Sequence, residues 1–237
     1  MPTWSKLQFK DSPLSVAQGE VSGHSPRNIF GYQLAVTTTF IPAWEYATSY
    51  VYPTTGLLMS VSSTNAGDNG DPVKIIGLDV DYNVIEETVI LPGITTKQFF
   101  RINDVLYLGT GGNDGLISVS NGGVNYAAIR IGDGRNQASI YTVPAGKCFF
   151  LYRIDAFSAD SIAAKPGIFK NVSINSTGQV FDVARTTFFN NMNIQRRIPF
   201  KYDEKTDIQF QVRTPSGTHE MNVFAEGILT DITVLRK

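Results

Sequence analysis

The residue types that most often carry chemistry are few in this chain, and their spacing does not form a recognisable site. His24 and His219 are the only histidines, and they lie near opposite ends of the sequence. Neither has a second metal ligand two or four positions away, so a zinc site or a catalytic triad would have to be assembled from both ends. We therefore predict no catalytic residue, no metal ligand and no enzymatic activity.

Two acidic segments superficially resemble catalytic or calcium-binding motifs. Asp79–Asn83 reads DVDYN, as at the start of a calcium loop, but Val84 stands where that loop needs Gly and Ile90 where it needs Glu. Glu86 and Glu87 are neighbours, and on a strand they would point to opposite faces and could not form an acid–base pair with each other. The first segment is better explained as a turn between two strands, and Glu86 and Glu87 as part of the second of these strands.

The glycine-rich loops and the single cysteine also give no sign of a cofactor site or a reactive thiol. Gly109–Gly112 and Gly132–Gly134 lack the glycine spacing and the following helix that a phosphate site requires. Cys148 lies in the apolar run 148–152, where burial raises a thiol pKa and makes a poor nucleophile. No intrachain disulfide is possible, which favours assembly in a reducing cytoplasm. We predict no cofactor.

Composition narrows the set of partners. The chain has 237 residues, a formal net charge of −1 and 17% charged residues, so it offers no general surface for phosphate groups. No signal peptide is recognisable, and no segment approaches the ~20 apolar residues that span a bilayer. We expect neither nucleic acid nor a membrane as a direct partner.

The stretch Tyr141–Ile154 has the clearest strand–turn–strand pattern in the sequence. Pro144 and Gly146 suit a tight turn, with an extended segment before it and an aromatic, apolar run after it. On a strand, odd and even positions face opposite sides. A run that is apolar at both is best explained by burial on both sides, inside a β-sandwich. The only plausible helix is Ala156–Lys165, which lacks a clear apolar stripe.

Short strand patterns recur along most of the sequence, with turn residues every 8–12 positions. They predict an all-β fold, an antiparallel β-sandwich of jelly-roll-like type. Asn121–Gly123 is a strong hairpin turn because Asn and Gly accept positive φ. The other predicted strands are Leu57–Ser62, Val73–Val80, Val84–Leu91, Gln98–Leu108, Gly115–Ser120, Val124–Ile131, Gly167–Ile174, Val180–Phe189, Ile194–Phe200, Asp207–Val212 and Met221–Leu229.

The N-terminal residues differ from the rest. Residues 1–30 hold many Pro and Gly residues, yet Trp4, Leu7 and Phe9 are large apolar groups at roughly alternate positions. We interpret 1–30 as an extended arm that lies across its own body or a neighbouring subunit. Residues 31–237 would form one β-sandwich domain, with a subdivision near residue 143 as the alternative.

An aromatic cluster follows the first strand. Trp44, Tyr46, Tyr50 and Tyr52 lie in irregular sequence, which suits a protein interface or a sugar-stacking surface. The structural alternative is that these rings cover one end of the sandwich. Together with the arm, they supply our interface candidates: Trp4, Leu7, Phe9, Trp44, Tyr46, Tyr50 and Tyr52.

Several turn and strand motifs between residues 20 and 212 resemble a family of virion structural proteins of tailed bacteriophages, especially marine and cyanobacterial phages. Pro92, before Gly93, and Cys148 depart from the family pattern. The motifs are Gly23–Tyr32, Tyr50–Pro53, Ile76–Asn83, Glu86–Gly93, Phe100–Asn103, Asn136–Ala138, Tyr141–Lys147, Ile198–Phe200 and Glu204–Ile208.

The resemblance implies a non-enzymatic building block of a virion, assembled in the host cytoplasm. Its expected partners are other virion proteins, the major capsid or tail proteins, and further copies of itself, with a trimer as one expected homo-oligomer. Capsid decoration is the leading interpretation. A neck, tail or baseplate adaptor is the first alternative, and a carbohydrate-binding module built on the aromatic cluster is the second.

Overall fold

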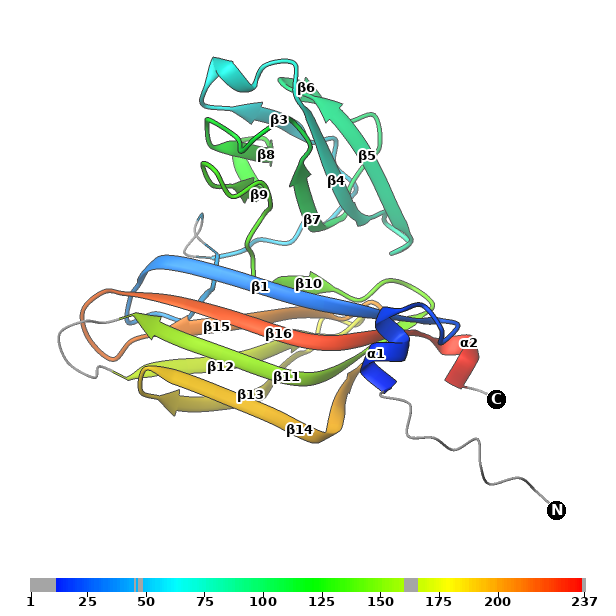
Figure 1. Cartoon of the computed structure of the whole chain (residues 1–237), viewed down its shortest axis with the longest axis vertical. Helices are drawn as coiled ribbons and strands as arrows, with labels where there is room; N and C mark the ends of the chain where they lie inside the picture. Colours follow the sequence, from blue (N-terminus) through cyan, green and yellow to red (C-terminus); the bar gives the residue numbers. More distant parts are fainter. Residues whose placement is uncertain (1–11, 45, 47–48, 160–165, 236–237) are drawn as a thin grey trace.

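The computed structural model describes residues 12–44, 46, 49–159 and 166–235. Almost every element in them is a β-strand, and all strand pairs are antiparallel. The all-β, antiparallel prediction is therefore confirmed. The strands gather into two units that lie one above the other (Figure 1).

The larger group, which we call the main unit, contains two sheets. Sheet I has the order β1-β16-β11-β14, and sheet II has the order β10-β15-β12-β13 with β2 also paired to β15. Side chains from both sheets, such as Phe149 of sheet I and Phe169 and Phe210 of sheet II, share one buried core. The elements of this unit are α1 (Ser12–Ala17), β1 (His24–Val36), β2 (Ile41–Pro42), β10 (Ile140–Thr142), β11 (Lys147–Ala159), β12 (Gly167–Ile174), β13 (Val180–Phe188), β14 (Asn191–Tyr202), β15 (Asp207–Arg213), β16 (His219–Asp231) and α2 (Ile232–Leu235).

Strand pairing in the main unit is nested. The first strand, β1, pairs with the last, β16; β2 and β10 pair with β15; β11 pairs with β14; and β12 pairs with β13. Each pair therefore encloses the next along the chain, as in one long hairpin folded over on itself. This brings the N-terminal strand beside the C-terminal strand.

Strands β2 and β10 together form one interrupted strand line along β15. Pro42 pairs with Gln211, and Ile140 pairs with Gln209, so the two pieces follow one another along β15. Between them, the Ser139 amide donates to the Ala43 carbonyl at 3.0 Å. The chain thus leaves this line after β2 and returns to it at β10.

The intervening chain forms the second group, which we call the inserted unit. Its two sheets have the orders β6-β3-β8-β9 and β5-β4-β7, and they enclose a separate core that includes Met59, Ile75 and Val105. Position 143 lies within the main unit, between β10 and β11. The elements of the inserted unit are β3 (Ser60–Ser63), the 3-10 helix η2 (Ala66–Asp68), β4 (Pro72–Leu78), β5 (Val84–Ile90), β6 (Gly93–Ile94), β7 (Arg101–Tyr107), β8 (Ile117–Asn121) and β9 (Val124–Ile129).

Both predicted turns of the inserted unit are confirmed. The Asp79 carboxylate accepts hydrogen bonds from the amides of Asp81 (2.9 Å) and Asn83 (2.8 Å) in the turn between β4 and β5. Tyr82 takes a φ of 67° there. The Asn121–Gly123 segment closes the hairpin of β8 and β9, and Gly122 and Gly123 both have positive φ.

The Tyr141–Ile154 stretch is strand, turn and strand as predicted, but it is not a hairpin. Its first strand, β10, lies in sheet II, whereas its second strand, β11, lies between β14 and β16 in sheet I. Gly146, with φ 72°, turns the chain from one sheet to the other. Cys148, Phe149 and Leu151 are fully buried, but Phe150 and Tyr152 are only half-buried, so the apolar run is not buried on both sides along its whole length.

Two local expectations need correction. The predicted arm contains the short helix α1, and from His24 onward its residues belong to β1. The predicted helix Ala156–Lys165 begins instead as the end of β11, because Ala156 packs into the core between the sheets; residues 160–165 lie outside the described part. No helix among the described residues has the length and apolar character to cross a membrane.

Candidate functional site

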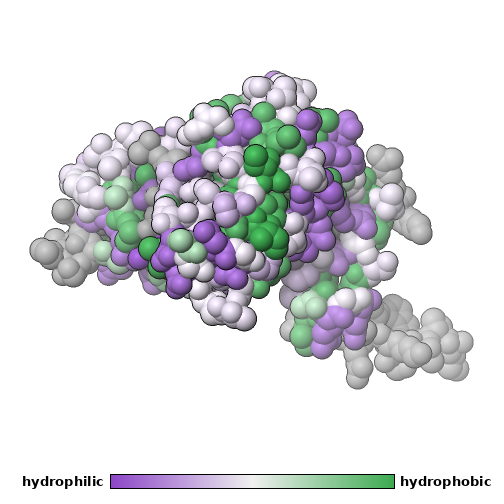
Figure 2. Space-filling view, turned by 90° about the horizontal axis from the view of Figure 1, so that it is seen from above, coloured by the Kyte–Doolittle hydropathy of each residue, from purple (hydrophilic) through white to green (hydrophobic). Residues whose placement is uncertain are grey.

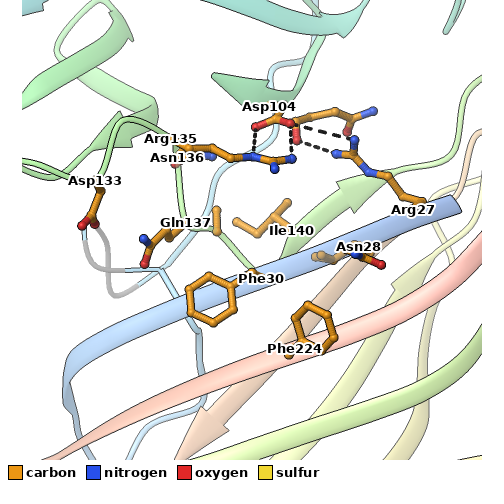
Figure 3. Close-up of a pocket in the computed structure, with 13 residues that line it drawn as sticks. Arg27, Asn28, Phe30, Asp104, Asp133, Arg135, Asn136, Gln137, Ile140 and Phe224 are labelled. Atoms are coloured by element: carbon orange, nitrogen blue, oxygen red, sulfur yellow. Dashed lines mark hydrogen bonds and ion pairs between the residues drawn. The ribbon is translucent and has the colours of Figure 1, made fainter. Parts of the chain in front are cut away.

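A cleft of about 340 Å³ opens where the two units meet, along the edge strand β1. Figure 3 shows Asp104 and Arg135 on one side of it and Phe30 and Phe224 on the other. The lining comes from β1, β7, β10, β16 and the segment 133–138 that leads back into the main unit. It consists of Arg27, Asn28, Ile29, Phe30, Asn103, Asp104, Asp133, Arg135, Asn136, Gln137, Ala138, Ile140 and Phe224.

Asp104 is the fixed charge of the cleft. Its carboxylate is buried and accepts from Nε of Arg135 at 3.0 Å and from an Nη of the same guanidinium at 2.5 Å. A guanidinium nitrogen of Arg27 lies 4.0 Å from it on the other side. Two guanidinium groups therefore flank the Asp104 carboxylate. They fix its orientation and supply hydrogen bonds and positive charge to its oxygens.

Arg27 links β1 to the inserted unit. Its Nη2 donates to the Asn103 carbonyl at 3.0 Å, and its guanidinium carbon lies 4.6 Å from the centre of the Tyr141 ring. Asn103 in turn exchanges two hydrogen bonds with the backbone of Thr142, at 2.9 and 2.8 Å. An amide side chain of β7 thus pairs with β10 much as a neighbouring strand would.

A buried ion pair outside the cleft also joins the units. Arg101 at the start of β7 donates from two nitrogens to the two carboxylate oxygens of Asp207 at the start of β15, both at 2.9 Å. Thr142 donates its hydroxyl to Asp207 at 2.6 Å, and Arg101 also donates to the Pro53 carbonyl at 2.9 Å. Burial alone would lower the pKa of Arg101, but the hydrogen bonds and charge of Asp207 outweigh it and raise that pKa.

Other polar groups of the cleft have no partner in the described chain. The side chains of Asn28, Asp133 and Gln137 make no hydrogen bond or ion pair with another described residue. Asn136 accepts at its Oδ1 from the Ala128 amide at 3.3 Å, and its NH₂ group has no described acceptor. The cleft therefore combines the paired charges of Asp104 and Arg135 with the unpaired carboxylate of Asp133 and with unused amide groups.

The aromatic interface candidates have different environments. Trp44 is buried, with 2% of its surface exposed, and its ring lies 5.5 Å from that of Tyr50, which is 4.9 Å from that of Tyr52. Desolvation raises the pKa of both tyrosines. Tyr46 contacts Trp44 at 6.3 Å between ring centroids. These rings pack on one another at the junction of the units, and Trp44 offers no open face for a sugar.

Other candidates from the sequence do not meet at the cleft. Trp4, Leu7 and Phe9 lie outside the described residues. His219 is buried and His24 bonds the Ser22 carbonyl nearby at 2.9 Å. Cys148 is fully buried, which raises its thiol pKa. Among the described residues, no group of three or more His, Cys, Asp and Glu side chains could hold a metal ion.

The residues that line the cleft were not recognised as a site from the sequence. The available sign was the run of charged and amide residues from Asp133 to Gln137, of which only the glycine-rich loop Gly132–Gly134 was considered as a binding site. The motifs of the family resemblance also gather at this junction: Gly23–Tyr32 supplies Arg27, Phe100–Asn103 supplies Arg101, and Glu204–Ile208 supplies Asp207. Only the fold brings them together.

No protein-family model and no curated protein matches this sequence. Among solved structures, the Gx strain of infectious bursal disease virus is 9% identical over 88% of this chain and 73% of that chain, with a TM-score of 0.20. The T=1 particles derived from that virus give 9% identity, coverage of 89% and 74%, and a TM-score of 0.19. The VP2 subviral particle of the same virus is 11% identical in sequence over 89% of this chain and 78% of that chain, with a TM-score of 0.17. TM-scores this low do not establish a shared fold.

Proposed function

We propose that this chain is a structural component of a tailed-phage virion, a capsid decoration or accessory protein that acts through contacts between subunits. The nested pairing of the main unit carries the proposal. With β2 and β10 counted as one, eight strands form two four-membered sheets, and successive strands change sheet everywhere except at the hairpin of β12 and β13. We infer that this is a jelly-roll arrangement, an architecture that recurs in viral capsid domains. Architecture alone does not determine function. The proposal therefore also depends on the sequence resemblance to virion proteins of tailed phages.

Two free sheet edges support a role in assembly. β14 ends sheet I and β13 ends sheet II, so each has one side without a strand partner in the described chain. Exposed apolar side chains lie on both strands: Ile198 is 84% exposed on β14, and Phe181 is 49% exposed on β13. A long edge of this kind is an aggregation risk unless another subunit covers it, so we expect β13 and β14 at a subunit contact.

The end of the molecule formed by the inserted unit offers a second contact surface. Seen from that end, hydrophobic residues form a band between hydrophilic ones (Figure 2). Apolar surface gathered in this way is typical of protein contacts. The exposed large apolar residues of the inserted unit include Leu58, Val84, Ile90, Ile94 and Val124.

A reconstruction of the intact particle tests the proposal. We expect particles made without this protein to lack density at symmetry-related positions on the outside of the shell, and adding the purified protein should restore it. Loss of density at the neck, tail or baseplate would instead support the alternative, an adaptor of the same virion. Particles that keep all their density would overturn both assignments.

Deletion of residues 2–22 tests the arm separately. We expect the shortened protein to fold and to bind particles more weakly, because the apolar groups of Trp4, Leu7 and Phe9 are then missing. A matched variant that removes the three side chains by substitution with Ser keeps the chain length. Normal assembly of both variants would exclude a clamping role for the arm without affecting the assignment to the virion.

A further inference from the structure

The cleft between the units differs from the rest of the surface in the kinds of group that it places together. Its volume of about 340 Å³ falls at the lower end of the range for small-molecule sites. Its walls come from both units, and the contacts of Arg27 and Asn103 hold those walls in place. The cleft is therefore formed before any ligand arrives.

One wall is aromatic. Phe30 on β1 and Phe224 on β16 are direct cross-strand partners, and Figure 3 shows their two rings side by side at the cleft. Phe30 is 38% exposed, although its ring carries no polar group that would gain from contact with water. Two neighbouring phenyl rings offer an apolar platform that a ligand with an apolar face can cover.

Unused hydrogen-bonding groups come from two parts of the cleft: Asn28 lies on β1 together with Phe30, and Asp133, Asn136 and Gln137 lie on the segment 133–138. The amides of Asn28 and Gln137 each offer an acceptor oxygen and an NH₂ donor, and none of these atoms bonds another described residue. Asn136 adds an NH₂ group, and the free carboxylate of Asp133 adds acceptors. A ligand whose own groups both donate and accept would match these groups.

The charges of the cleft balance. Its lining contains two arginines and two aspartates, and Asp104 is bound by Arg135 and flanked by Arg27. A phosphate or carboxylate ligand would meet no unpaired cation there and would lie near the free Asp133. The cleft is thus suited to an uncharged polar ligand.

We propose that this cleft binds a neutral saccharide. Sugar hydroxyl groups both donate and accept hydrogen bonds, as the amides of Asn28 and Gln137 do, and the C–H face of a pyranose ring is apolar and packs on aromatic rings. Phe30 and Phe224 form the stacking platform, and Asn28, Asp133, Asn136 and Gln137 bind the hydroxyl groups. This site is separate from the Trp44 cluster and does not depend on the virion assignment.

Binding is measured on the purified full-length protein by saturation-transfer NMR and titration calorimetry. The probes are maltose, cellobiose, lactose and methyl α-mannoside, followed by an array of bacterial surface glycans. We expect at least one neutral glycan to bind, and its affinity to fall about tenfold or more in Gln137→Ala and Phe224→Ala, as expected for loss of about 1.4 kcal/mol. Asn28→Ala, at an exposed position, should weaken binding even if Phe224→Ala does not fold.

Matched controls separate the cleft from the rest of the surface. Phe157→Ala removes an exposed phenyl ring of sheet I outside the cleft, and Gln98→Ala removes an exposed amide of the inserted unit. Both should bind as the unaltered chain does. The proposal is overturned if no neutral glycan binds, if acidic glycans bind better than neutral ones, or if the controls lose as much affinity as the cleft variants.

Discussion

The arginine–aspartate contacts at the junction of the two units differ in how much water surrounds them. Arg101 and Asp207 are both buried, whereas the Arg135 side chain that holds Asp104 is 54% exposed. Exposed pairs contribute little to stability because water screens them, but removal of one partner of a buried pair leaves a charge without compensation. The two contacts should therefore respond differently to substitution.

Arg101→Ala should lower the free energy of unfolding by about 3–5 kcal/mol, because Asp207 would remain buried with only the Thr142 hydroxyl to solvate it. Urea denaturation followed by circular dichroism measures the change. The matched control is Lys201→Ala, which breaks the exposed pair with Asp203 at 2.8 Å and should cost less than about 1 kcal/mol. Equal losses in the two variants would contradict this account of the junction.

The tyrosines at the junction predict a loss of stability in alkaline solution. Desolvation raises the pKa of Tyr50, so above the ordinary tyrosine value of about 10 the unfolded chain releases this proton before the folded chain does. Stability is therefore full below about pH 10 and then falls, by at most about 1.4 kcal/mol per pH unit for this group. Tyr50→Phe should make the fall shallower when unfolding is measured between about pH 9 and 11. An unchanged slope would show that Tyr50 is not responsible.

At the scale of the element, sequence patterns predicted most strands because their causes are local. Alternating apolar residues, Asn-Gly turns and Pro–Gly corners operate within a few positions, so β4, β5, β12 and β13 fall within two residues of the predicted ranges. The helix expected from Ala156 failed for a tertiary reason, since β11 continues between β14 and β16. The cleft could not be predicted, because Arg27, Asp104 and Arg135 lie far apart in the sequence.

Gly31 on β1 occupies a position where a larger residue should not fit. A Cβ added there would overlap the Ala43 carbonyl oxygen and lie 2.5 Å from the Ser139 amide nitrogen, where β2 and β10 meet. Gly31→Ala should therefore destabilise the protein by about 1–3 kcal/mol, measured by thermal unfolding. Gly19→Ala, with nothing within 4 Å but a φ of +75°, should cost only about 1 kcal/mol. A Gly31→Ala protein as stable as the Gly19→Ala protein would show that the backbone there can move apart.

At the scale of the whole molecule, the important observation is that a complete unit interrupts a single strand. Propensity and periodicity say which residues are extended, but they do not say which strands pair over long distances. The sequence therefore indicated many strands and one domain, with a subdivision near residue 143 as the alternative, and the division between two cores became visible only in three dimensions. The alternation of β2, β10 and their neighbours between sheets could not be read from local patterns.

Removal of residues 44–139 tests this architecture directly. Joining Ala43 to Ile140 would make β2 and β10 continuous, with Ala43 opposite Phe210 between the pairs Pro42–Gln211 and Ile140–Gln209. Combined with Asp207→Asn, which removes the charge that Arg101 compensates, the shortened chain should fold. A dispersed NMR spectrum and a cooperative unfolding transition would be expected. A chain that stays unfolded, even with Asp207→Asn, would show that the main unit needs the inserted one.

The nested pairing also fixes the order in which the protein can form as it leaves the ribosome. The inserted unit draws all its strands from one continuous stretch of chain, so it can fold while translation continues. Sheet I cannot close until β16 has emerged, since β1 pairs with it from His24↔Thr230 to Val36↔His219. At about 5–20 residues per second, the edge of β1 waits roughly 10 to 40 seconds for its partner. Nascent chains are therefore most exposed to mispairing during that interval, and a chaperone that binds β1 would act there.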